Sequence, residues 1–191
     1  MRPRDNPYRS ERMDGLPYRL RGADWATLIE RVRAGGWLEV VGPHGAGKTR
    51  LLEELARRLP AAGVPTRYAR VGPGGQDVSR SMFNRERALL IDGLEAAPRR
   101  AAWRVRLALA TGRARAVVVA RHVGGRARRL FTCAPDYALA RELVDALDPA
   151  SAPDDASLRA LLAGHEGNLR AVFRALYDRA AGLPSATRRA G

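Results

Sequence analysis

Short apolar runs alternate with amphipathic segments along the first two thirds of the chain. The apolar runs predict strands at residues 37–41, 64–71, 88–93, 116–121 and 130–134. Apolar residues at helical spacing predict a helix before the first strand, at 23–35, and helices between later strands, at 49–63 and 96–110. Strands that are apolar throughout and alternate with helices indicate a parallel sheet covered by helices on both faces.

The pattern changes after Pro135, where only helical periodicity remains, at about 136–147, 154–163 and 168–181. Residues 1–22 are polar, contain three prolines and predict an irregular arm. We therefore expect four parts, which are an N-terminal arm and helix at 1–35, an α/β core at 36–135, a small helical subdomain at 136–183 and a flexible tail at 184–191.

The net charge of +14 narrows the choice of partners. Every basic residue except Lys48 is arginine, and an arginine-rich surface is typical of proteins that bind nucleic acid or another polyanion. A GC-rich coding bias would explain the choice of arginine over lysine. It would not explain why the chain has 34 basic residues and only 20 acidic ones.

The single cysteine, Cys133, cannot form an intrachain disulfide, and its apolar surroundings predict a core position. The N-terminus lacks the apolar region of a signal peptide, and no apolar run approaches the ~20 residues that span a bilayer. We therefore expect a cytoplasmic protein without a membrane partner.

The stretch "GPHGAGKT", residues 42–49, satisfies G-x-x-x-x-G-K-[ST] and links a predicted strand to an amphipathic helix. In such a loop, backbone N–H groups and the positive end of the helix surround phosphate oxygens. The pattern predicts that Lys48 reaches the β- and γ-phosphates and that the Thr49 hydroxyl ligates Mg²⁺. The predicted nucleotide contacts are the loop and the next residue, namely Gly42, Pro43, His44, Gly45, Ala46, Gly47, Lys48, Thr49 and Arg50.

A second motif, "LLIDGLE", ends a predicted strand in Asp92. This looks like the Walker B element, in which the carboxylate holds magnesium, usually through water. Gly93 occupies the place of the usual second acid, so Glu95 becomes the candidate that activates or orients water. An N-cap role for Asp92 and a plain surface role for Glu95 are the other interpretations.

The order of these motifs, followed by a third apolar strand and a helical tail, resembles the AAA+/STAND branch of P-loop ATPases. "LLIDGLE" is similar to the NACHT-type form, and the arm followed by "GPHGAGKT" looks like small bacterial AAA+ ATPases of the secretion and transposition-regulator kind. The resemblance covers residues 30–181. It implies a three-layer α/β/α P-loop fold with a parallel sheet of about five strands, a C-terminal helical lid, and ATP and Mg²⁺ as ligands.

The same resemblance implies roles for several arginines. Arg121 or His122 would replace the polar sensor at the end of the third strand, and "GNLR" places Arg170 where a lid helix carries its phosphate-sensing arginine. Between the last two strands, Arg128 or Arg129 would be the finger presented to a neighbour in a homo-oligomer. Because arginine is frequent in this chain, a solvated loop and a chance match explain these residues equally simply.

The leading hypothesis is a magnesium-dependent ATPase that acts as a nucleotide-driven switch or accessory. A non-catalytic, nucleotide-gated binding module, with DNA as one partner, and a P-loop small-molecule kinase stay open as alternatives. ATP is favoured over GTP because no N-K-x-D element is present. Tyr8 or Tyr18 is a candidate to pack on adenine, and the catalytic candidates are Lys48, Asp92, Glu95 and Arg170.

Overall fold

The computed structural model describes residues 5–71, 78, 82–84 and 87–183. The contacts divide them into two units, one formed by 20–43 and 47–133 and the other by 5–19, 44–46 and 134–183. The tail predicted at 184–191 lies outside the described residues, as do residues 72–77. In the described part of the chain, no helix is long and apolar enough to cross a membrane.

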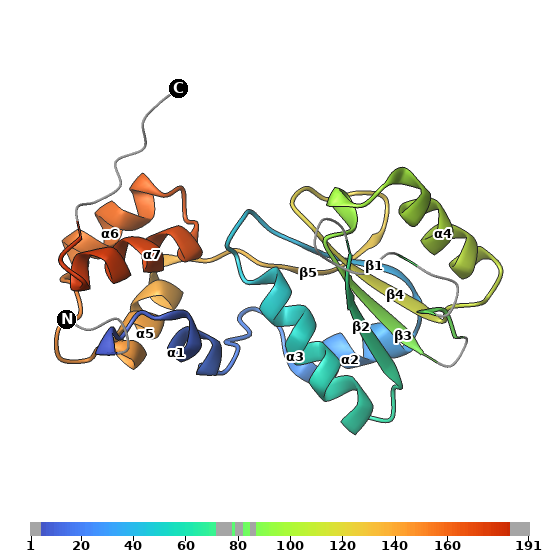
Figure 1. Ribbon diagram of the computed structural model, residues 1–191. Coiled ribbons are helices and arrows are strands. Elements are labelled where there is room, and N and C mark those ends of the chain that lie inside the picture. The colour runs from blue at the N-terminus through green and yellow to red at the C-terminus, as the bar shows by residue number, and fades with distance from the viewer. Residues whose placement is uncertain (1–4, 72–77, 79–81, 85–86, 184–191) are drawn as a thin grey trace. The chain divides into compact units, whose positions relative to one another are not determined.

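The first unit is built on a sheet of five parallel strands in the order β2-β3-β4-β1-β5 (Figure 1). The predicted strands are confirmed, although the last begins at Arg128, two residues earlier than expected. Cys133 follows it and is buried, as predicted. The strands are β1 (Gly36–Val41), β2 (Thr66–Arg70), β3 (Ala88–Asp92), β4 (Ala116–Arg121) and β5 (Arg128–Thr132).

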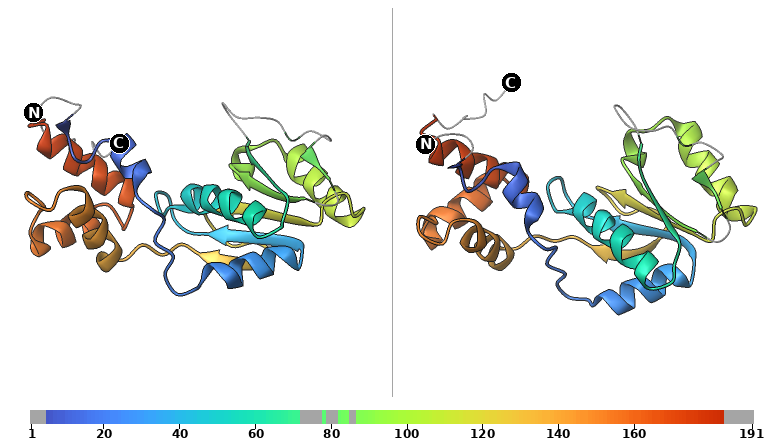
Figure 2. Two further views of the ribbon diagram at one scale, coloured as in Figure 1. Left: turned by 90° about the horizontal axis from the view of Figure 1, so that it is seen from below. Right: turned by 60° about the horizontal axis from the view of Figure 1, so that its bottom comes forward.

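Helices cover both faces of this sheet, with α2 (Trp25–Arg33) and α3 (Lys48–Ala61) on one face and α4 (Arg99–Ala110) on the other (Figures 1 and 2). The Arg58 guanidinium lies 4.4 Å from the centre of the Trp25 ring and so joins α3 to α2. The three-layer α/β arrangement predicted from the sequence is therefore confirmed.

Alternation along the strands explains the three layers. Leu89 and Ile91 of β3 pack in one core with Val105 and Ala108 of α4. Leu90, between them in the sequence, must point to the opposite face because successive side chains of a strand alternate. Both faces are apolar, so each needs a helical cover.

The second unit contains helices only, and three of them begin at side-chain caps that satisfy free backbone N–H groups. Its helices are α1 (Ser10–Gly15), α5 (Tyr137–Leu147), α6 (Asp155–Gly164) and α7 (Leu169–Ala180). The capping side chains are Asp136, Asp154 and Asn168, which accept from the N–H groups of Leu139, Ser157 and Ala171.

The arm, expected to be irregular, contains α1 and belongs to the helical unit. Tyr8 is buried, with its ring centroid 6.3 Å from that of Phe173, and the Asn6 amide donates to the Tyr177 carbonyl at 2.9 Å. The sequence grouped this arm with the following helix, whereas the contacts place residues 5–19 and α2 in different units.

Candidate nucleotide site

The glycine loop lies where the sequence predicted it, between the end of β1 and the start of α3. Gly47 precedes the first residue of α3 and has a φ of 86°, in the left-handed region that favours glycine. This conformation lets the chain turn from the loop directly into the helix, so the N–H groups of the first turn of α3 lie beside the loop.

Lys48 is folded back onto its own loop. Its Nζ donates to the carbonyls of Gly42 at 2.6 Å and Pro43 at 2.7 Å, and lies 3.1 Å from Nδ1 of His122. The residue is only 9% exposed. Its ammonium is thus held at the mouth of the loop by acceptors that a phosphate oxygen can replace.

Thr49 and Asp92 meet at the carboxyl edge of the sheet. The Thr49 hydroxyl donates to Oδ2 of Asp92 at 2.9 Å. A hydroxyl and a carboxylate oxygen at this spacing are ligands that Mg²⁺ accepts, with water and phosphate completing its shell. No group of three or more His, Cys, Asp and Glu side chains suited to a metal occurs among the described residues. The Thr49–Asp92 pair thus supplies two oxygen ligands, and its assignment to Mg²⁺ stays a prediction.

Two residues of β2 complete the surroundings of Asp92. The Arg70 guanidinium lies 3.5 Å from the same Oδ2. Burial, and secondly the charge of Asp92, raise the pKa of Tyr68 to about 12. These neighbours were not predicted, but the sequence held a signal for them. Parallel strands end at the same edge, and the register pairs Arg70 with Asp92.

The missing second acid has a structural reason. Gly93 has a φ of 78°, and a Cβ added to it would lie well under 3.0 Å from the carbonyl oxygen of Val71. Real Cβ atoms do not approach that closely, so a glutamate at position 93 would require the end of β2 to move. Any acid that activates water must therefore come from elsewhere.

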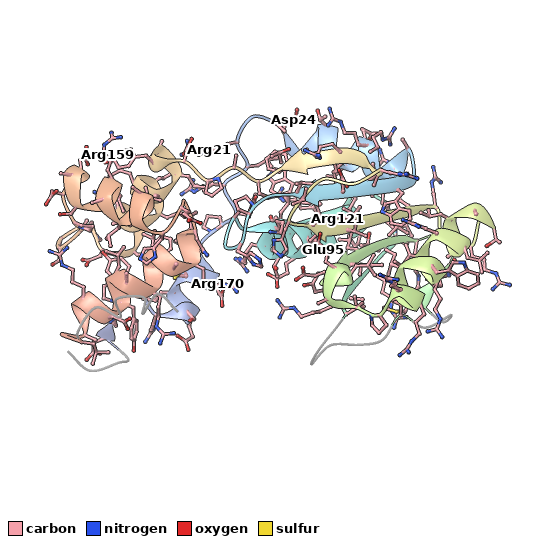
Figure 3. The ribbon with its side chains drawn as sticks, turned by 90° about the horizontal axis from the view of Figure 1, so that it is seen from above. Arg21, Asp24, Glu95, Arg121, Arg159 and Arg170 are labelled. Carbon is pink, nitrogen blue, oxygen red and sulfur yellow. The ribbon has the colours of Figure 1, made fainter. Side chains whose placement is uncertain are left out.

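Glu95 lies in η3 (Leu94–Ala96), the short 3-10 helix after β3. Its Oε2 accepts from the His122 backbone N–H at 2.9 Å, and Oε1 lies 3.5 Å from Nε of Arg121, the pair visible in Figure 3. The His122 ring nitrogen Nε2 is 3.7 Å from the same carboxylate. The two sensor candidates thus contact the candidate water-activating acid, and His122 links it to Lys48.

The predicted position of Arg128 and Arg129 was wrong, because both residues lie within β5 and not in a loop before it. Both are drawn into the strand by pairing with β1, where Glu39 is opposite Arg129. Arg129 Nε donates to the buried Glu39 carboxylate at 3.2 Å. Arg128 donates to the carbonyls of Gly35 and Arg31 at 3.2 and 3.4 Å.

Other predicted contacts stay predictions. Arg170 is exposed in the first turn of α7, a helix of the other unit. His44 is exposed in the loop, and Arg50 pairs with Glu53 of its own helix at 3.2 Å.

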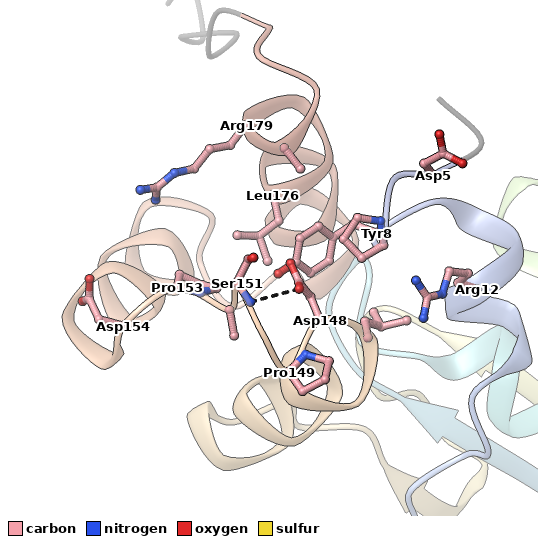
Figure 4. A pocket seen from close by; sticks show the side chains of 14 residues that line it. Asp5, Tyr8, Arg12, Asp148, Pro149, Ser151, Pro153, Asp154, Leu176 and Arg179 are labelled. Atoms are coloured by element: carbon pink, nitrogen blue, oxygen red, sulfur yellow. Dashed lines mark hydrogen bonds between the residues drawn. The ribbon is translucent and has the colours of Figure 1, made fainter. Parts of the chain in front are cut away.

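The helical unit has a hollow of its own, of about 710 Å³, which Tyr8 lines together with Arg12, Asp148 and Arg179 (Figure 4). Burial, and secondly the charge of Asp148, raise the pKa of the Tyr8 hydroxyl to about 12. Since Tyr8 is 5% exposed, its ring serves the core of this unit.

The strand order, the glycine loop after β1 and the acid at the end of β3 define the class of fold, a three-layer α/β fold of the kind that P-loop NTPases have. Among solved structures, a point variant of Thermotoga maritima RuvB is similar at a TM-score of 0.56 and 16% identity, over 79% of this chain and 57% of that one. Brucella abortus NtrX, solved in complex with ATP, is similar at a TM-score of 0.50 and 16% identity, over 94% of this chain and 54% of that one.

This chain therefore spans little more than half the length of these neighbours, and the likeness shows the fold alone. No family model matches the chain, and no curated protein matches it.

Proposed function

We propose that this protein is a magnesium-dependent ATPase of AAA+-like type that acts as a nucleotide-driven switch or accessory. The observation that carries the proposal is the meeting of both motifs at one sheet edge. Thr49 is bonded to Asp92 at 2.9 Å, and Lys48 lies 3.1 Å from His122, whose backbone holds Glu95. Residues far apart in sequence thus form one cluster with the chemistry of phosphoryl transfer.

In this proposal each side chain has one task. Lys48 leaves the loop carbonyls and binds the β- and γ-phosphate oxygens, and Thr49 and Asp92 hold Mg²⁺. A magnesium ion held by these two residues would supply positive charge that offsets the charge of the phosphates. Glu95 orients the attacking water and takes its proton, while Arg121 and His122 set the position of that carboxylate.

The finer assignments are also proposals. Arg170 would contact phosphate from the lid helix, and "LLIDGLE" supports the STAND branch within the AAA+-type fold. For a homo-oligomer, Arg128 is the better finger candidate, because Arg129 is committed to the buried Glu39. The charge of +14 supports contact with nucleic acid or another polyanion, and the protein would work in the cytoplasm.

One observation favours a second candidate, the non-catalytic binding module gated by nucleotide. Glu95 is tied to Arg121 and to the His122 backbone, and a carboxylate held by these contacts is not free to orient a water molecule. If this arrangement persists with ATP bound, the protein binds nucleotide without turning it over.

The test measures ATP affinity and phosphate release with Mg²⁺ for the wild type, Lys48→Ala and Lys48→Arg. We expect Lys48→Ala to abolish both. Lys48→Arg, which keeps the charge, should lose most activity because a planar guanidinium does not reproduce the point contact of an ammonium. Unchanged affinity and turnover in Lys48→Ala would refute the nucleotide site.

Glu95→Gln separates the two candidates. Loss of turnover with intact ATP affinity supports the ATPase, with Glu95 acting on water. Tight binding by the wild type with no turnover at any protein concentration, with or without nucleic acid, supports the binding module instead.

A further inference from the structure

The outward face of α4 carries the one exposed aromatic ring among the described residues. The Trp103 side chain is 62% exposed, and Leu107, one turn further along, is 42% exposed. Every other described aromatic side chain is buried or partly buried. An indole that stays in water forgoes the favourable free energy of burying it. The surface around an exposed tryptophan is therefore a candidate contact surface.

The two faces of α4 are sharply different. Ala101, Val105 and Ala108 are buried against the sheet. At 3.6 residues per turn the opposite face contains Arg99, Trp103, Arg106 and Leu107, all of which are exposed. The helix forms the outer layer on its side of the sheet, so this face points away from the strands (Figures 1 and 2).

The segment around α4 carries charge of one sign only. Between Glu95 and Asp136 the chain has ten arginines and no acidic residue. Two of them, Arg99 and Arg100, occupy the first turn of α4, where the helix dipole disfavours a cation and no acidic residue is present. The two arginines add positive charge to this end of α4, which an anionic partner would meet.

We propose that this α4 face, made of Arg99, Arg100, Trp103, Arg106 and Leu107, binds single-stranded nucleic acid. Guanidinium groups pair with phosphates, and an exposed indole offers a stacking platform for an unpaired base. A duplex keeps its bases stacked on one another, so it could use the arginines but not the ring. An acidic protein segment would also meet the charge, but only a single strand offers a phosphate and a stacking ring at every residue, and competition by polyglutamate tests the alternative.

The proposal deepens the polyanion contact proposed above and rests on it, but it does not depend on the nucleotide site. The Arg106 guanidinium lies 5.4 Å from the centre of the Trp37 ring, and the residue is still exposed. The α4 face thus combines the two chemistries that single strands require, and the site of ATP chemistry lies at the strand ends instead.

The test is fluorescence anisotropy of a labelled oligothymidylate of about 20 nucleotides, long enough for one binding site, with the full chain and no nucleotide. Trp103→Ala should weaken binding about tenfold, while Trp103→Phe keeps a ring and most of the affinity. Oligothymidylate should also quench the indole fluorescence of the wild type, and Trp103→Ala should lose most of that quenching. Because Trp103 is exposed, both variants should fold, which circular dichroism checks.

The charge is tested with a matched pair of variants. Arg99→Ala/Arg100→Ala should weaken binding and lower the slope of log affinity against log salt by about 1.4, from two lost phosphate contacts. Arg57→Ala/Arg174→Ala removes the same charge from side chains that are 66% and 80% exposed elsewhere. We expect this control to bind nearly as the wild type does, and Lys48→Ala also.

Four results would overturn the inference. They are equal affinity of Trp103→Ala and wild type, equal losses in the two arginine pairs, tighter binding of a duplex of the same length, and displacement by polyglutamate as effective as by unlabelled oligothymidylate. If the wild type bound no nucleic acid at all, both this inference and the proposed polyanion contact would be refuted. The proposed nucleotide site would not be, because Lys48→Ala tests it separately through ATP affinity and turnover.

Discussion

Two glutamates of the sheet unit each lie beside a strand arginine, Arg129 of β5 and Arg121 at the end of β4, but in opposite surroundings. Glu39, in the middle of β1, is 1% exposed, accepts from the Gly125 N–H at 2.8 Å and lies 3.2 Å from Arg129. Glu95 has a side chain 31% exposed and lies 3.5 Å from Arg121.

The difference decides what each pair can do. A buried carboxylate that loses its cation is left as an uncompensated charge, so the Glu39 pair is fixed once the protein has folded. A partly exposed carboxylate can exchange its arginine for water at little cost. The same two residue types therefore hold the structure together at β1, and at η3 they permit the movement that the proposed chemistry needs.

The largest effect should come from Arg129→Ala. We expect the free energy of unfolding to fall by about 3 kcal/mol, because the buried Glu39 carboxylate loses its cation, whose own side chain is 47% exposed. Urea denaturation measures the change. Arg128→Ala, at the adjacent position with bonds to carbonyls only, is the control and should change stability far less. Equal stability of the two variants would show that the pair of Glu39 and Arg129 does not stabilise the fold.

Glu95→Gln should reduce ATP turnover about a hundredfold and change the free energy of unfolding by less than about 0.5 kcal/mol. The reason is that a partly exposed acid supports chemistry and not the core. Phosphate release and urea denaturation are measured on the same preparation. Glu142→Gln, at a side chain 38% exposed, is the control and should turn over ATP normally. A large loss of stability in Glu95→Gln would show that Glu95, like Glu39, supports the fold, and would contradict the comparison.

Gly93→Ala should lower the free energy of unfolding by about 2–3 kcal/mol, since a left-handed backbone and a close carbonyl both oppose a side chain. Gly112 has a φ of 66°, but a Cβ added there would meet no atom within 4 Å, so Gly112→Ala isolates the backbone cost. We expect about 1 kcal/mol there. Thermal or urea denaturation compares them, and equal losses would mean that the Val71 carbonyl moves easily.

The smallest effect is expected from His122→Ala. Lys48 should bind ATP about threefold more tightly, because one of the contacts that its ammonium must give up is removed. Calorimetry with a non-hydrolysable ATP analogue measures the change. Weaker binding would instead show that His122 contacts the nucleotide, which is the sensor role predicted from the sequence.

Local patterns in the sequence predicted most of the fold. Apolar runs located the strands and side-chain caps located α5, α6 and α7, because each signal lies within a few residues of what it determines. The place of the arm was not predictable. Its attachment rests on Asn6 and Tyr8 meeting residues of α7, more than 160 positions away.

The candidate site was predictable to the same extent. Two contiguous motifs named Lys48, Thr49 and Asp92 as candidates, and the structure brings Thr49 and Asp92 within hydrogen-bond distance, while their assignment to magnesium stays a prediction. Arg70 and Glu39 were missed because their importance comes from neighbours in adjacent strands. For Arg129, the composition suggested a free loop residue, and only the register with β1 revealed its buried partner.

The close approach of Gly93 to Val71 has a consequence for anyone who would redesign this protein. If the proposed function holds, a single substitution that places the usual acid after Asp92 is opposed by the carbonyl of Val71, which occupies the space that its first side-chain atom needs. The end of β2 would have to be rebuilt first. For a lineage evolving by single changes, the same barrier makes the use of a more distant acid, such as Glu95, the accessible route.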